Sequence, residues 1–507
     1  MRNNPTRSPY DPDSETGYNV WINESLDYNV VADAMLEDYY GLDKWFKPEV
    51  NLKLNIKPIP GLNYQQVVGY ENRQWELHQY WPSTHRSEID NSRKGHAHLA
   101  FSKTENLTSE GYFSYVKDFK GGHNLNATAG YSYFEVNGEN FGMDNYNFSV
   151  DGIKYWDIGQ GSYLTDGKAG MSSGKSVTER LFSFFARANY SYQDKYMLSA
   201  SIRHEGSSKF AADNRWANFW SATAGWRISN EEFMKDFDWL DDLKIRFGYG
   251  VTGNNDFSAT YMANMLGSDT NWMMPNGTWA YSYGKSQNVN PNLGWEEKKE
   301  WNLGVDYSFF EGRLYGKFDY YRREVDNLLF SVKVPQPPYT QGSQMQNIGS
   351  MESKGWEFEV GGDIIRTKDF TWSSSMNLSH NTGKILTLEG DNSYHNGNGF
   401  VAPGTPGDAA RMEAGSTIGS FYMWKFAGFD DEGSFLLYNK DGEVIPAAQK
   451  TENDKQYIGN YTPKLIIGWS HTLTYKNFDL GINLRSWIDF DVYNTINMYY
   501  GIQGQGN

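Results

Sequence analysis

Residues 301–309 read Trp-Asn-Leu-Gly-Val-Asp-Tyr-Ser-Phe, and this stretch decides the fold class because it alternates strictly. Every second side chain in it is large and apolar: Trp301, Leu303, Val305, Tyr307 and Phe309. The residues between them are small or polar. Successive side chains of a β-strand point to opposite faces, so the pattern predicts a strand with one apolar and one polar face. Helical spacing does not fit it.

The same alternation recurs in both directions from this stretch, and it predicts about 14 strands. They fall near residues 49–57, 64–72, 108–118, 123–134, 178–192, 195–206, 215–228, 242–252, 297–310, 312–325, 353–365, 369–381, 463–475 and 477–490. Residues 1–48 and 420–462 fit no place in this series.

The links between the predicted strands are of two kinds. Very short links, such as Glu311-Gly312, alternate with long ones, such as Gly253 to Glu296, from about residue 108 to residue 381. Outer-membrane barrels join their strands by short periplasmic turns and long extracellular loops, whereas a soluble β-sandwich shows no such regular order. The sequence therefore predicts an all-β fold, a transmembrane antiparallel β-barrel.

The composition agrees with a barrel and excludes several other classes. Aromatic residues make up 16% of the 507 residues and Gly contributes 51, yet the mean hydropathy is −0.69. One face of each strand meets lipid and the other a polar lumen, so such a mixture is expected. The net charge of −16 argues against binding nucleic acid. The absence of cysteine excludes thiolate catalysis and cysteine metal sites.

The long link from Asn254 to Glu296 holds the candidate substrate-binding residues. Aromatic side chains lie there among Asn, Ser, Gly and Asp, and sugars are held by aromatic faces together with amide and carboxylate hydrogen bonds. The candidates are Trp272, Trp279, Tyr281 and Tyr283. The alternative is that these aromatic residues pack the loop or contact a partner protein.

Other motifs of the chain indicate no chemistry. Gly248 to Gly253 ends a strand with no helix after it, so it lacks the geometry that cradles a dinucleotide. His96 and His98 would share a face of a strand, but a metal site needs a third ligand, which the neighbouring sequence does not supply. No nucleophile elbow with an acid and a His in order appears. We expect no catalytic residue, no metal and no cofactor.

An ordered series of motifs resembles the SusC/RagA class of TonB-dependent transporters. It includes Lys195 to Phe210, Ser221 to Ser229, Leu243 to Asn254, Asn290 to Glu296, Asn347 to Glu359 and Tyr457 to Lys464. The residues that match as structural signatures are Asn214, Arg215, Trp216, Gly225, Trp226, Arg227, Gly250, Gly253, Asn254, Gly355 and Trp356.

This resemblance implies a barrel of about 22 strands closed by an N-terminal plug. It also implies a SusD-like surface lipoprotein as lid, energy from TonB, and import of an oligosaccharide or a peptide through the outer membrane. Residues 1–507 would then be a partial barrel without the plug and the final strands. The alternative functions are, first, a passive porin and, second, an outer-membrane barrel enzyme.

Overall fold

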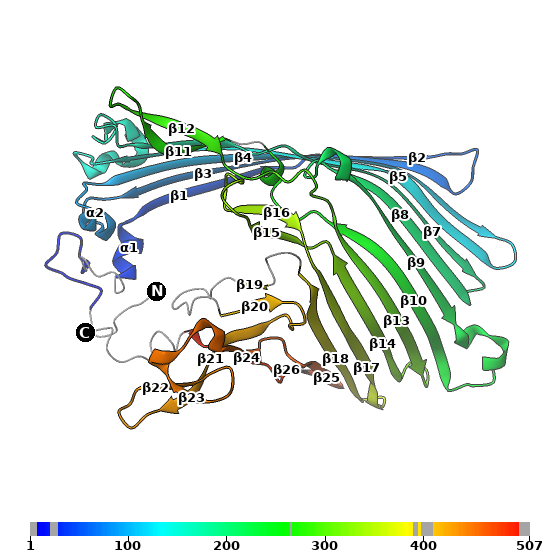
Figure 1. Cartoon of the computed structure of the whole chain (residues 1–507). Helices are drawn as coiled ribbons and strands as arrows, with labels where there is room; N and C mark the ends of the chain where they lie inside the picture. The colour runs from blue at the N-terminus through cyan, green and yellow to red at the C-terminus, as the bar shows by residue number, and fades with distance from the viewer. Residues whose placement is uncertain (1–7, 21–28, 264–265, 389–393, 397–408, 496–507) are drawn as a thin grey trace. The chain divides into compact units, whose positions relative to one another are not determined.

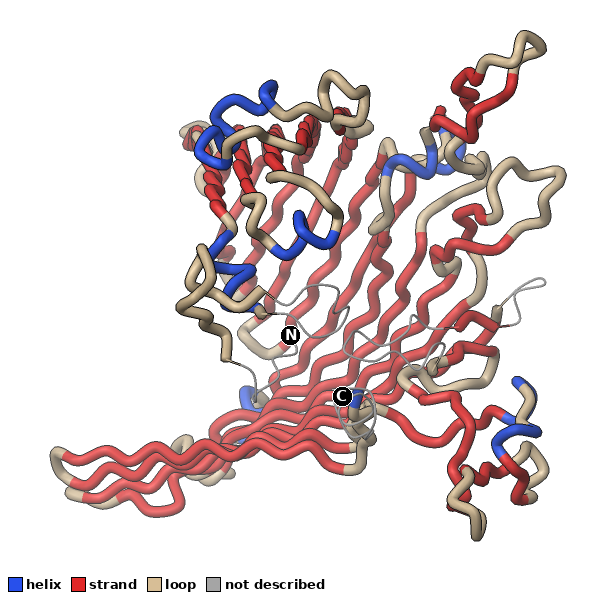
Figure 2. The backbone as a smooth tube through the Cα atoms, turned by 90° about the vertical axis from the view of Figure 1, so that its left-hand side faces the viewer, coloured by secondary structure: helices blue, strands red, loops and turns tan. Residues whose placement is uncertain are grey.

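The computed structural model describes residues 8–20, 29–263, 266–388, 394–396 and 409–495. Strands dominate it, and its helices are few and short (Figure 2). None of the described helices is long and apolar enough to cross a membrane. The chain divides into two compact units, and four long strands contribute residues to both.

The first unit comprises Met1–Lys53, Gln65–Gly111 and Ser132–Phe182. Its strands follow the order β1-β3-β4-β5, with β2 beside β3 and β6 beside β5. A small core of Tyr80, Ala97, Phe148 and Tyr155 lies in this unit. The elements are α1 Val30–Leu36, β1 Asp38–Phe46, β2 Glu49–Asn55, β3 Leu62–Trp81, α2 Arg86–Asp90, β4 His96–Phe119, β5 His123–Tyr146, η1 Asp151–Gln160 and β6 Gly170–Lys175.

The second unit comprises Leu54–Tyr64, Tyr112–Tyr131 and Ser183–Asn507. Figure 1 shows its long strands side by side in chain order, and from β8 onward each pairs antiparallel with the next. They are β7 Glu179–Tyr192, β8 Tyr196–Ser207, β9 Trp216–Arg227, β10 Leu240–Asn254, β13 Glu296–Phe309, β14 Leu314–Asp326, β17 Ser350–Arg366, β18 Phe370–Thr387, β25 Leu465–Tyr475 and β26 Phe478–Ile488. We call β8 to β25 of this series the wall. Its turn end has the short links, and its loop end has the long ones.

The links between the strands of the second unit contain small sheets and short 3-10 helices. The strands are β11 Leu266–Met273, β12 Trp279–Lys285, β15 Leu329–Lys333, β16 Ser343–Asn347, β19 Tyr394–Asn396, β20 Arg411–Glu413, β21 Ser420–Phe429, β22 Phe435–Tyr438, β23 Val444–Pro446 and β24 Lys455–Asn460. The 3-10 helices are η2 Ala212–Asn214, η3 Ile228–Asn230, η4 Glu232–Met234, η5 Ala259–Met262, η6 Ala447–Gln449 and η7 Glu452–Asp454.

The all-β prediction is confirmed, since each of the predicted strand ranges overlaps a strand of the structure. Some bounds were wrong. The strand predicted at 64–72 is β3, which continues to Trp81. The strand predicted at 108–118 is β4, which begins at His96, and the one predicted at 123–134 is β5, which continues to Tyr146. Polar residues occupy both faces of these extensions, so the alternation that marks a strand fades there. Residues 420–462, which the alternation could not place, form the four-stranded sheet β23-β22-β21-β24.

Neighbouring wall strands contact each other through aromatic rings. Each of these rings lies over a glycine of the next strand. Tyr321 pairs with Gly355, where a Cβ would lie 2.7 Å from the Tyr321 hydroxyl. Tyr307 pairs with Gly316, where a Cβ would lie 2.5 Å from the Tyr307 hydroxyl. A ring across a strand glycine restores the contact that the missing side chain would make. Both pairs therefore use a glycine and an aromatic residue together.

Candidate functional site

One face of the wall carries large apolar side chains that are open to the surroundings. The register aligns Phe247 of β10 with Leu303 of β13, and Leu303 with Tyr320 of β14. Phe247 is 50% exposed and Leu303 is 44% exposed. In water, an exposed apolar surface of this extent would be unfavourable, because apolar area costs roughly 25 cal/mol per Å². The alternation predicted for residues 301–309 is therefore present, and its apolar side chains lie together on one exposed face of the sheet.

Aromatic residues border this apolar face at two levels. Near the loop end, the rings of Trp301 and Tyr320 lie 5.4 Å apart. Near the turn end, Trp239 stacks on Phe309 at 5.7 Å. From Trp301 to Phe309 the strand rises about 27 Å, and tilt shortens that length. An apolar band of about 25 Å between two aromatic girdles is the exterior of an outer-membrane barrel.

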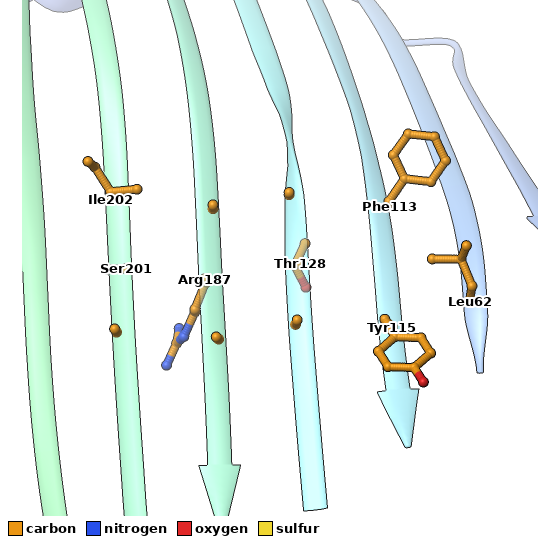
Figure 3. A pocket seen from close by; sticks show the side chains of 12 residues that line it. Leu62, Phe113, Tyr115, Thr128, Arg187, Ser201 and Ile202 are labelled. Carbon is orange, nitrogen blue, oxygen red and sulfur yellow. The ribbon is translucent and has the colours of Figure 1, made fainter. Parts of the chain in front are cut away.

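The apolar face continues over the strands that precede the wall. Figure 3 shows Leu62, Phe113 and Ile202 around a stretch of small side chains. That stretch is lined by alanines at positions 127, 129, 186, 188 and 200, and its cavity volume is about 470 Å³. Since Ala200 pairs with Ala222 of β9, the same face extends into the wall.

The opposite face of the wall is polar, and its charges are paired. Arg246 of β10 donates two hydrogen bonds of 2.8 Å to Asp306 of β13, and a further one of 3.1 Å to Asp319 of β14. Gly304 lies between them on β13, where a Cβ would come within 2.6 Å of both Arg246 and Asp319. The missing side chain therefore lets one guanidinium bridge three strands.

Glu357 and Glu359 of β17 lie on this same face. Glu359 pairs with Lys317 across the strands at 3.1 Å. Glu357 pairs in register with Asp319, whose charge Arg246 balances. This face thus carries both signs of charge and has a surface that water can wet. Such a face suits the lumen of a barrel.

At the loop end, one buried amide joins two loops. Asn288 follows β12 and is 7% exposed. Its amide nitrogen donates to the carbonyls of Gln341 and Ser343, at 2.7 Å and 2.9 Å. Its oxygen accepts from the backbone of Thr340 and Gln341 and from the Thr340 hydroxyl. These contacts use both N–H groups of the amide and both lone pairs of its oxygen, which three donors share, so the loop before β13 is fixed to the β15–β16 hairpin.

The signature residues at the loop end belong to the same framework. The indole of Trp295, which is 8% exposed, donates to the carbonyl of Arg215 at 3.0 Å. The Asn214 amide donates to the carbonyl of Asn292 at 2.9 Å. The Trp295 ring packs 4.8 Å from Phe210, which is almost fully buried. These contacts give the motif around Asn290–Glu296 a structural role.

Three further signature residues at the loop end have packing partners. Trp216 stacks on His204 with ring centroids 4.7 Å apart. The Asn254 amide donates to Glu296 at 3.0 Å, and these two residues form the pair of β10 and β13 nearest the loop end. A Cβ at Gly253 would come within 2.1 Å of the Phe219 ring, so that ring needs a glycine there.

The turn end holds another group of the signature residues. Glu231 accepts hydrogen bonds from the Tyr196 hydroxyl at 2.6 Å, the Trp226 indole at 3.1 Å and Lys195 at 3.1 Å. The hydrogen bond from Tyr196 is the main reason that the pKa of the Glu231 carboxyl lies below its usual value. Arg227 pairs with Asp242 at 3.1 Å. These contacts close the link between β9 and β10.

The remaining signature residues lie within the paired wall strands. Gly225 and Gly250 belong to the register of β9 with β10, at Gly225–Arg246 and Gly250–Ser221. Gly355 lies under Tyr321, and Trp356 approaches His380 with ring centroids 6.1 Å apart. Their places are structural, at strand pairs and at the girdle near the loop end.

The predicted substrate-binding residues lie on a separate hairpin of β11 and β12. The register pairs Trp279 with Met273, Trp272 with Ala280, Tyr281 with Asn271 and Tyr283 with Ser268. Trp279 is 64% exposed and Tyr283 is 69% exposed. The side chains of Trp272 and Tyr281 lie outside the described part of the structure. Two of the four candidates thus lie open on one strand of the hairpin.

His96 and His98 share a partner that the local sequence did not indicate. Asp144 of β5 lies 2.9 Å from His96 Nε2 and 2.8 Å from His98 Nδ1, through the same carboxylate oxygen. His96 also stacks between Trp81 and Tyr146, at 4.6 Å and 4.1 Å. Asp144 is distant in sequence, and only the pairing of β4 with β5 brings it here. Among the described residues, no group of three or more His, Asp or Glu has the arrangement to hold a metal ion.

Comparison with known protein families accounts for both faces of the wall. Residues 2–494 match the family described as TonB dependent receptor-like, beta-barrel. The chain belongs to this family. It is therefore an outer-membrane β-barrel chain, whose apolar face meets lipid and whose polar face lines the lumen.

The relatives in this family agree with the SusC/RagA resemblance. TonB-dependent receptor P3 of Formosa agariphila is 31% identical over 86% of this chain and 44% of its own length. TonB-dependent receptor SusC of Bacteroides thetaiotaomicron is 34% identical over 65% of this chain and 33% of its own length. The chain spans less than half the length of these relatives.

A solved structure supports the fold of the barrel chain. The RagAB peptide transporter matches with a TM-score of 0.76 at 24% identity, over 89% of this chain and 48% of that chain. At this identity the likeness shows the fold alone. The predicted resemblance to the SusC/RagA class is confirmed by the family and its relatives together.

Proposed function

We propose that the full protein containing this barrel chain actively imports a large nutrient across the outer membrane. The observation that carries the proposal is the two-faced wall, because a charge-paired polar face behind an apolar belt can line a path for a polar solute. Energy would come from TonB through a plug in the lumen, and a SusD-like lipoprotein would act as lid. Relatives named TonB-dependent receptors and the RagAB peptide transporter support this interpretation.

We propose an oligosaccharide as the substrate, with a peptide as the second candidate. Trp279 and Tyr283 are exposed on a hairpin at the loop end, where the sequence also supplies Asn, Ser and Thr. Flat aromatic faces with amide and hydroxyl groups nearby suit the alternating apolar and hydroxyl surfaces of a sugar. The peptide alternative is supported by the likeness to RagAB, which is a peptide transporter.

An uptake experiment in cells tests the proposal and separates its rivals. The full-length protein is expressed with its lipoprotein partner in a strain that needs the oligosaccharide for growth, with and without functional TonB. An importer loses uptake when TonB is lost. A passive porin keeps uptake, which is then limited by solute size alone. Cleavage of the oligosaccharide by the purified protein would instead favour a barrel enzyme.

A further inference from the structure

The lipid-facing side of the wall has a depression near the turn end of β14, β17, β18 and β25. Two rows of side chains, each made of residues paired in register across the strands, cross this depression. One row runs through Val360, Met376 and Trp469. The next row runs through Leu314, Gly362, Ser374 and His471. In the second row the two small residues lie side by side between larger ones, which leaves a hollow.

The backbone maintains this hollow. A Cβ at Gly362 would lie 2.1 Å from the carbonyl oxygen of Arg313, so no larger residue fits there without a shift of the backbone. The pairing of β17 with β18 slips between Asp363 and Ile365, which is a β-bulge. Bulges turn side chains aside, and Ile364 at this bulge is 55% exposed on the rim.

The resulting cavity has a volume of about 450 Å³, and we call it the Gly362 groove. Its walls are mainly apolar, from Leu314, Val360, Ile364, Met376 and Trp469. The Trp469 indole donates to the Ser374 hydroxyl at 2.9 Å, so the indole N–H has an acceptor beside the groove. An apolar groove on a face that meets lipid is suited to a hydrocarbon chain.

One cation at the groove has no carboxylate partner among the described residues. Arg313 lines the groove and belongs to the short turn between β13 and β14. Asp363, which also lines it, is matched by Arg366 at 3.7 Å and by the Ser373 hydroxyl at 2.6 Å. Within the described residues, the ion pairs include none to Arg313. Because the adjacent Phe310 belongs to the girdle of the turn end and is 52% exposed, Arg313 lies at the level of lipid headgroups.

We propose that the Gly362 groove binds an anionic glycerophospholipid of the periplasmic leaflet, with an acyl chain in the groove and the phosphate at Arg313. Guanidinium groups form strong charge-assisted hydrogen bonds with phosphate, and a basic residue near a membrane surface favours anionic lipid. The outer-membrane location of the family brings this lipid to the groove. The proposal is independent of the transported substrate.

Native mass spectrometry of the full-length protein tests this site. The protein is equilibrated with phosphatidylglycerol and phosphatidylcholine of equal chain length, and the retained lipid is counted as mild detergent is increased. Wild-type protein should retain phosphatidylglycerol preferentially. Arg313→Gln should reduce that preference about fivefold, as expected for one basic residue near the headgroup. Ile364→Trp should fill the groove and reduce retention of both lipids.

Matched variants keep the test decisive. Leu303→Trp places the same ring on the same face outside the groove, and Lys476→Gln removes a charge at another short turn. Both should behave as wild type. If Ile364→Trp fails to fold, Leu314→Trp replaces it. Equal retention of the two lipids by wild type, or unchanged retention in both Arg313→Gln and the groove-filling variant, would mean non-specific annular lipid only and overturn the proposal.

Discussion

Strands β12 and β13 are separated by ten residues of the chain and carry the same alternating pattern, but they differ in their neighbours. β13 pairs with β10 on one side and with β14 on the other. Within the described residues, β12 forms a two-stranded sheet with β11 alone. Trp301 and Phe309 of β13 lie in the two girdles, whereas Trp279 and Tyr283 of β12 are more than 60% exposed. Alternation therefore predicts a strand, and the number of paired neighbours decides whether that strand belongs to the wall or to a hairpin in a loop.

The largest difference should appear when a charge is placed on the apolar side of each strand. Leu303→Arg should destabilise the full-length protein by about 2–4 kcal/mol, because the charge enters the hydrocarbon band. Trp279→Arg should change stability by less than about 0.5 kcal/mol, since its site is exposed and outside the band. Urea titration of protein folded into vesicles measures both values. Asn302→Arg, on the lumen side of β13, is the control, and equal losses at 302 and 303 would contradict the assignment of the two faces.

The next effect concerns the amide that joins the two loops. Asn288→Ala removes five hydrogen bonds of a buried amide and leaves backbone groups of Thr340, Gln341 and Ser343 without these partners, which should cost about 1–3 kcal/mol. Hydrogen exchange should accelerate in residues 286–295 and 340–343 and remain unchanged in β13. Asn292→Ala is the control, because Asn292 is exposed and contributes its backbone here. Unchanged exchange in Asn288→Ala would show that other contacts hold the loops.

A smaller effect is expected at the strand glycine below the charge bridge. Gly304→Ala should separate Arg246 from Asp319 and keep its pair with Asp306, at a cost of about 1 kcal/mol. The matched control is Gly481→Ala in β26, where a Cβ meets nothing within 4 Å. Urea titration compares the two. An equal loss in both variants would mean that the cost is a general property of strand glycines rather than of this bridge.

The smallest effect on stability, below about 0.5 kcal/mol, should follow replacement of Trp272, Trp279, Tyr281 and Tyr283 together by Ala. Substrate capture should nevertheless weaken, since each aromatic contact contributes about 0.5–1.5 kcal/mol. Growth on limiting oligosaccharide should then need at least about tenfold more substrate. TonB-dependent uptake with normal affinity would assign these residues to loop packing and leave the importer proposal intact.

The sequence was sufficient to predict the fold class and the apolar face of each wall strand, because lipid on one side and water on the other impose a period of two on the residues themselves. The ordered series of motifs was sufficient to predict the family. Both Leu303 and Glu359 lie on the faces that their neighbours in sequence predict. The short links at Glu311-Gly312 and Lys476-Asn477 are also where the alternation placed them.

The contacts that only the tertiary structure decided join residues far apart in the chain. Asp144 joins His96 and His98, Asn288 joins two loops, and Arg246 joins Asp306, through hydrogen bonds between residues 46 to 60 positions apart. Gly304 leaves the space that the Arg246 guanidinium occupies. The sheet of residues 420–460 escaped the alternation because its strands are short and interrupted by turns. The alternation within one strand shows whether each face contacts lipid or water. Contacts between particular side chains depend on the register between strands, which the alternation does not give. The Gly362 groove is of the second kind, since four strands must align before two small residues become a hollow.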